Sequence, residues 1–216
     1  MRYALSWSGG KDSTLALDRA RRAGLDVACL FNIYEGSSGR VRFHGVRREL
    51  IVAQARALGL PLVAAHTHPD DYETVFLRLL DQLRAEGIGG IMFGNIHLAD
   101  IRAWYEERTS GRGFAHAEPL WGAAPSDLIR EFVARGYLAR IVSIDLARAR
   151  PEWLGARLDL ELIRAIEAEP AVDLCGEQGE YHTFVSGGPL FRQPLPVQSG
   201  ETIELEGHRF IELQLG

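Results

Sequence analysis

The sequence is poor in cysteine and contains no long apolar run. Its two cysteines, Cys29 and Cys175, stand far apart in the chain, so they suggest no disulfide framework and fit a reducing compartment. No apolar run approaches the roughly 18 residues that a membrane-spanning helix needs, and the first seven residues do not resemble a signal peptide. These absences exclude a disulfide-stapled scaffold and a membrane protein, and they predict a cytoplasmic location.

Positive charge is also scarce, and lysine is almost absent. The 24 Lys and Arg residues stand against 29 Asp and Glu residues, which leaves a net charge of −5, whereas proteins that bind nucleic acid are usually basic. A nucleic-acid partner is therefore disfavoured. The 216 residues, 46% of them hydrophobic, are enough for one large domain or for one domain with a small appendage.

Strand-like and helix-like segments alternate through the first half of the chain. Apolar runs typical of buried strands cover residues 2–7, 26–34, 62–66 and 90–96. Each is followed by helical periodicity, over residues 13–23, 44–58, 72–85 and 98–107. Gly59 stands where the second helix should end. This alternation predicts an α/β fold, in which helices cover both faces of a doubly wound, mostly parallel sheet.

The pattern changes after Gly113, and a second, smaller α+β portion is expected there. The sequence predicts two helices, at 126–135 with Ser126 as the N-cap and at 158–168, on either side of a strand at 138–146. The tail alternates like a β-hairpin, whose edge could pair with a second copy in a homo-oligomer. We therefore expect an N-terminal domain of residues 1–115 and a C-terminal portion of residues 116–216.

The one lysine of the chain lies in the loop between the first predicted strand and helix, in the run SGGKDS. A helix N-terminus offers unpaired N–H groups and the positive end of the helix dipole, so it favours an anion. Lysine adds a compact charge where a broad guanidinium would be harder to fit. Aspartate would repel phosphate unless it holds Mg²⁺ or caps the helix. The alternative is an ordinary glycine turn with a surface lysine. The residues expected at the phosphate are Ser8, Gly9, Gly10, Lys11, Asp12 and Ser13.

A second segment rich in reactive side chains covers residues 173–183, DLCGEQGEYHT. Glu177 and Glu180 could bind ammonium or act as a base, and His182 could carry a proton near neutral pH. Cys175 could be a nucleophile, although the sequence shows no base beside it. One cysteine and one histidine make at best half a zinc site. The alternative is a polar turn that precedes a core strand.

These motifs carry a resemblance to a known family. SGGKDS after an N-terminal strand resembles the PP-loop of the ATP pyrophosphatase (adenine nucleotide α-hydrolase-like) superfamily. Further motifs are similar to those of the diphthine–ammonia ligase family in its short, single-ligase form. They are HGVRRELIVAQARALGLPL, FGNIHLADIRAW, EPLWG and CGEQGEYHTFV followed by GGPLF.

The resemblance implies an ATP-dependent ligase that uses Mg²⁺. Such an enzyme transfers AMP from ATP to a substrate carboxylate, releases pyrophosphate, and lets ammonia displace the AMP to form an amide. The carboxylate would belong to the diphthine of elongation factor two, or otherwise to a small metabolite. The expected catalytic residues are Lys11, Asp12, Glu177, Glu180 and His182, with Asp12 also as the metal ligand.

The resemblance also implies further binding residues. For the nucleotide these are Asn32, His44, Gly94 and Asn95, and for the substrate they are Arg102, Cys175, Gly176 and Thr183. The family usually has Gly-Asp-Ile after the fourth strand, whereas this chain has Gly94-Asn95-Ile96.

Two other functions remain open. The same adenylation chemistry could transfer sulfur to tRNA, but the distant cysteines and the net charge of −5 disfavour it. The chain could also be an adenine-nucleotide sensor without turnover.

Overall fold

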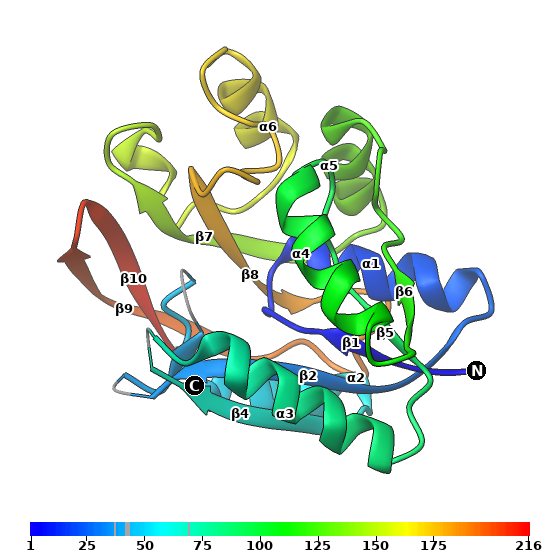
Figure 1. Cartoon of the computed structure of the whole chain (residues 1–216). Helices are drawn as coiled ribbons and strands as arrows, with labels where there is room; N and C mark the ends of the chain where they lie inside the picture. The colour runs from blue at the N-terminus through cyan, green and yellow to red at the C-terminus, as the bar shows by residue number, and fades with distance from the viewer. Residues whose placement is uncertain (37, 42–43, 69) are drawn as a thin grey trace.

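The computed structural model describes residues 1–36, 38–41, 44–68 and 70–216. The first sheet has the order β3-β2-β1-β5-β6, with β4 also paired to β2 (Figure 1). All its described strand pairs are parallel except that of β2 with β3. Its strands are β1 (Arg2–Ser6), β2 (Asp26–Glu35), β3 (Arg40–Val41), β4 (Leu62–Thr67), β5 (Gly90–Met92) and β6 (Ala115–Ala117). The prediction of an α/β fold with a mostly parallel sheet is confirmed.

Helices cover both faces of this sheet because its strands are apolar on both sides. In β1, Ala4 packs on one face with Phe76 of α3, while the next residue, Leu5, packs on the other face with Leu15 of α1. Alternate residues along the strand therefore pack into two separate hydrophobic clusters, one on each face of the sheet. The helices of this half are α1 (Lys11–Arg22), α2 (Arg48–Leu58), α3 (Tyr72–Ala85) and α4 (Ala99–Ser110).

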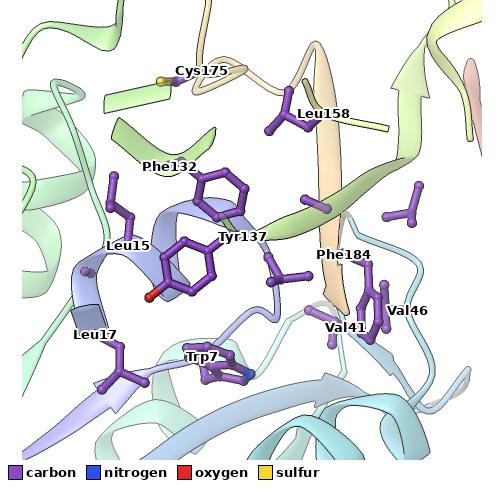
Figure 2. Close-up of a cluster of buried hydrophobic side chains, with 14 of the residues drawn as sticks. Trp7, Leu15, Leu17, Val41, Val46, Phe132, Tyr137, Leu158, Cys175 and Phe184 are labelled. Atoms are coloured by element: carbon purple, nitrogen blue, oxygen red, sulfur yellow. The ribbon is translucent and has the colours of Figure 1, made fainter. Parts of the chain in front are cut away.

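The second half forms an antiparallel sheet in the order β8-β7-β10-β9. Its elements are α5 (Pro125–Ala134), β7 (Leu138–Asp145), the 3-10 turn η1 (Pro151–Trp153), α6 (Leu160–Glu167), β8 (Tyr181–Gly187), β9 (Val197–Leu205) and β10 (His208–Leu215). Figure 2 shows Leu15 of α1, Phe132 of α5 and Phe184 in one buried cluster. The two halves therefore share a continuous core.

Several predicted boundaries were wrong. The second helix begins at Arg48 and not at residue 44, because the chain is still extended at Arg47. α5 begins at Pro125, whose fixed φ and missing N–H suit the first helical position, so Ser126 is not the N-cap. The fourth strand ends at Met92. The sequence also failed to predict the short strands β3 and β6.

Other expectations hold. Gly59 ends α2 in the left-handed conformation. The C-terminal hairpin is present, and it turns at Glu206 and Gly207, both with positive φ, as a tight two-residue hairpin turn requires. α1 begins at Lys11, so Lys11 and Asp12 belong to the first turn of the helix and not to the loop before it.

Candidate active site

The loop between β1 and α1 is held from behind by a buried glutamine. Gln54 of α2 donates to the carbonyl oxygens of Gly9 at 2.9 Å and Val185 at 2.7 Å, and it accepts from the Trp7 indole at 2.9 Å. Gly9 has a φ of 82°, and a Cβ there would lie 2.6 Å from the Gln54 side-chain oxygen. Glycine is therefore required at this turn.

The start of α1 is completed by a residue from the distant strand β8. The Lys11 N–H donates to the Thr183 hydroxyl at 3.0 Å, which satisfies one of the N–H groups that a helix start leaves unpaired. Ser8 and Ser13 bring their hydroxyl oxygens to 3.3 Å from each other. A side chain at Gly10 would lie 2.9 Å from the His44 ring. Thr183 thus lies against the start of α1 and the loop before it.

The Lys11 ammonium lies behind the loop and not in the open cleft described below. Its Nζ donates to Asp12 Oδ2 at 2.9 Å and to the Cys175 carbonyl oxygen, and it lies 5.1 Å from the centre of the Tyr181 ring. Burial lowers the pKa of Lys11, but the electrostatic interactions with Asp12, Tyr181 and Cys175 together outweigh burial and raise it overall. The group is therefore charged and 4% exposed, and its contact with phosphate stays a prediction.

Two carboxylates from different halves of the chain face the same cavity. Asp12 lies at the start of α1, and Glu177 accepts from the backbone N–H groups of Ile96 at 3.2 Å and His97 at 3.3 Å. Burial and the nearby Asp12 charge both raise the pKa of Glu177. Like charges that share a site favour either a proton or a bound cation between them.

His44 and His182 meet ring to ring at 4.5 Å between their centres. Burial lowers the pKa of His44 to about 4, and burial together with His44 lowers that of His182 well below its usual value. Both rings are therefore neutral at pH 7, so each offers one N–H donor and one acceptor nitrogen there.

These groups line a cleft made of two adjoining cavities at the carboxyl ends of β1, β2 and β5. The cavity of about 370 Å³ is largely apolar and aromatic. The residues that line this cavity alone are Trp7, Phe31, Asn32, Ile33, Val41, Tyr72 and Ile101. The cavity of about 200 Å³ is polar. The residues that line it alone are Asp12, Ser13, Phe93, Gly94, Gly176 and Glu177. Both are lined by Ser6, Ser8, His44, Asn95, Tyr105 and His182.

The position of the cleft follows from the strand order. β1 and β5 are neighbours, and the chain order reverses between them, so their connections lead to opposite sides. Open α/β sheets bind ligands at this kind of point. Gly94 lets the end of β5 approach α1, since a Cβ there would lie 3.1 Å from the Ser13 nitrogen.

Some predicted residues lie outside the cleft. The Glu180 carboxylate is 1% exposed and accepts from the Asp173 N–H at 3.0 Å. Cys175 is equally buried, and burial raises the pKa of its thiol to about 12, which disfavours a nucleophilic role. Arg102 lies 4.5 Å from the Trp121 ring centre and lines neither cavity.

Sequence reasoning missed three residues of the site. Gln54 could have been found in the sequence, because it is a polar residue four positions after Leu50 on the apolar face of α2. Tyr105 lines both cavities but looked like an ordinary helical aromatic. Glu118 follows β6, a strand that the sequence did not predict, and its side chain is 2% exposed.

A larger hollow of about 570 Å³ lies between η1 and α6. Its lining includes Arg150, Glu152, Arg157 and Glu169, and it shares no residue with the cleft. The larger hollow therefore contains none of the predicted functional residues.

Within the described residues, no group of three or more His, Cys, Asp or Glu side chains could hold a metal ion. Mg²⁺ needs no such cage, since it usually takes one or two carboxylates together with substrate phosphates. Asp12 and Glu177 line the same cavity, and a Mg²⁺ ion at Asp12 stays a prediction. Over the same part of the chain, no helix has the length and apolarity to cross a bilayer.

Comparisons with known proteins point to one family. The model of the diphthamide synthase N-terminal domain matches residues 1–114, and that of the diphthamide synthase C-terminal domain matches residues 124–214. The chain is 28% identical to the diphthine–ammonia ligase of Homo sapiens over 94% of this chain and 85% of that one. It is 27% identical to the diphthine–ammonia ligase of Bos taurus over 100% of this chain and 92% of that one.

Among solved structures, the chain is similar to the U34-tRNA thiolase NcsA from Methanococcus maripaludis. The TM-score is 0.37 at 15% identity, over 62% of this chain and 55% of that one. This likeness is too distant to bear on function.

Proposed function

The chain belongs to the diphthamide synthase family, and from this premise we propose that it is an ATP-dependent ligase that joins a carboxylate to ammonia. The observation that carries the proposal is the cleft, where Asp12 and Ser13 of α1, Asn95 after β5 and Glu177 of the second half meet. A phosphate-binding helix start and a possible base thus share one cavity, as two successive half-reactions on one carboxyl group require.

The lining of the cleft supports ATP as its ligand. The larger cavity suits adenine because Phe31, Tyr72 and Tyr105 line it. The smaller cavity suits the phosphates because it lies at the N-terminus of α1. Lys11 adds positive charge at the same helix end. Mg²⁺, when bound by Asp12 with Glu177 nearby, would neutralise phosphate charge.

The proposed reaction has two steps. A carboxylate oxygen of the substrate attacks the α-phosphorus of ATP, the bond between the α- and β-phosphates breaks, and pyrophosphate leaves. Ammonia then attacks the acyl carbon, its nitrogen loses a proton, and AMP leaves with the oxygen. Glu177 is the proposed base because burial and Asp12 raise its pKa, and the neutral His182, which lines the same cavity, is proposed to hydrogen-bond the reacting groups.

The substrate we propose is a protein that carries diphthine, because the relatives are diphthine–ammonia ligases. The carboxylate of a small metabolite is the second possibility. Sulfur transfer to tRNA has less support, because the Cys175 thiol is buried and held in its protonated form.

The test is release of pyrophosphate and AMP by the full chain with ATP, Mg²⁺ and ammonium. Diphthine-bearing elongation factor two and a pool of small carboxylates are offered separately. We expect Glu177→Gln to slow amide formation by roughly 10²–10⁴-fold, as loss of a general base does. Glu201→Gln, at an exposed carboxylate of β9, should leave the rate unchanged. Tight ATP binding without pyrophosphate release on any carboxylate would instead indicate a nucleotide sensor.

A further inference from the structure

A buried carboxylate lies directly beneath the cleft. Glu118 follows β6, and its side chain is 2% exposed. One carboxylate oxygen accepts from the Asn95 amide nitrogen at 2.7 Å and lies 3.1 Å from His116 Nε2. The other oxygen lies 3.5 Å from Arg102 Nε. Because the carboxyl ends of β5 and β6 are adjacent, Asn95 and Glu118 come together although 23 residues separate them.

The hydrogen bonds around His116 anchor this carboxylate. The Thr109 hydroxyl donates to the Tyr105 carbonyl oxygen at 2.9 Å and lies 3.1 Å from His116 Nδ1. An ionised carboxylate only accepts hydrogen bonds, so His116 Nε2 carries the ring hydrogen and donates to Glu118, while His116 Nδ1 meets the Thr109 hydroxyl. This hydrogen bond fixes the position of Glu118.

An anchored carboxylate determines how the Asn95 amide is oriented. An ionised carboxylate only accepts hydrogen bonds, so Asn95 turns its NH₂ group toward Glu118. Its amide oxygen then faces the opposite way. Asn95 is among the residues that line both cavities of the cleft, so it lies at their junction.

The junction lies between an aromatic cavity suited to a base and a polar cavity suited to phosphates. The part of a nucleotide between these two groups is the ribose, whose hydroxyls are hydrogen-bond donors. We propose that Glu118 is a positioning residue that orients the Asn95 amide oxygen to accept a hydrogen bond from a ribose hydroxyl of ATP. This rests on the proposed function only in that ATP occupies the cleft.

Calorimetric titration with ATP, 2′-deoxy-ATP and 3′-deoxy-ATP in the presence of Mg²⁺ tests this without turnover. For the wild-type chain we expect at least one deoxy analogue to bind about tenfold more weakly than ATP, as loss of one hydrogen bond predicts. Glu118→Leu should reduce this discrimination to about twofold or less, because the amide can then rotate. Glu118→Gln should retain it, because an acceptor oxygen remains.

Glu106→Gln is the matched control. Glu106 also lies 3.5 Å from Arg102 Nε, but no described contact joins it to Asn95, so its variant should discriminate like the wild type. Equal affinity of the wild type for all three nucleotides would overturn the inference while leaving the ligase proposal intact. Failure of the wild type to bind any nucleotide would instead remove the ligase proposal and the inference with it.

A second measurement covers the case in which Glu118→Leu does not fold. Asn95→Asp places two carboxylates against each other and should lower the melting temperature. Adding Glu118→Gln restores a hydrogen bond with donor and acceptor exchanged, and should recover most of the loss. A double variant no more stable than Asn95→Asp alone would mean that Glu118 does not determine the orientation of residue 95.

Discussion

Lys11 offers the sharpest test of the site, because its ammonium is buried behind the phosphate loop. Lys11→Met removes the donor to the Cys175 carbonyl oxygen, and leaving a buried acceptor unsatisfied costs about 1–3 kcal/mol. The Asp12 side chain is 33% exposed, so loss of that ion pair adds only about 0–1 kcal/mol. We expect the variant to be about 1–4 kcal/mol less stable than the wild type.

The measurement is thermal unfolding followed by circular dichroism. For a chain of this size each kcal/mol shifts the midpoint by roughly 2–4 °C, so Lys11→Met should melt about 2–16 °C below the wild type. Lys11→Arg keeps the charge but must fit a larger group against Leu15, Ile129 and Phe132, and overpacking costs about 1–3 kcal/mol. Arg21→Met, which removes a cation from the same helix, is the control.

The outcome that refutes this reasoning is a Lys11→Met variant that melts within about 1 °C of the wild type yet no longer binds ATP. Its ammonium would then act in the cleft as a phosphate ligand and not behind the loop. A loss of both stability and ATP affinity would mean that the group serves the nucleotide by holding the loop.

Three further predictions concern the same site. Gln54→Leu should lower the free energy of unfolding in urea by about 2–4 kcal/mol, because the Trp7 indole and the Val185 carbonyl lose this buried partner while the Gly9 carbonyl keeps its bond from the Val185 N–H; a change below about 0.5 kcal/mol would mean that Gln54 does not hold the loop. Since the folded pKa of His44 is about 4, the unfolded chain binds the extra proton between pH 6.5 and 4, so stability should fall as pH falls through that window. In His44→Phe the free energy of unfolding should depend less steeply on pH in that window. An unchanged pH dependence would mean that the His44 ring is not buried in its neutral form. Cys175→Ser should keep ligase activity within about threefold of the wild type because the thiol is unreactive, whereas loss of all activity would reinstate the sulfur-transfer hypothesis.

The sequence predicted the elements of the first half well because each carries its own signal. Apolar runs and helical periodicity depend on residues close in the chain, so β2, α3 and the end of α2 at Gly59 could be predicted. The errors fell where local patterns are weak. The strands β3 and β6 are two and three residues long, too short for any periodicity to register, and at the start of α5 proline, not serine, begins the helix.

For the site, too, the sequence predicted what depends on neighbouring residues and missed what depends on distant ones. By itself, the sequence determined that a helix start with two glycines and a lysine follows the first strand, and that a polar segment rich in glutamate comes much later. Only the tertiary structure decided that Glu177 faces the cleft while Glu180, three residues on, is buried behind it. Only the fold turned Lys11 toward a carbonyl oxygen 164 residues away and placed Glu118 under Asn95. The physical reason is that the direction of a side chain depends on the partners that packing supplies, and those partners are distant in the chain.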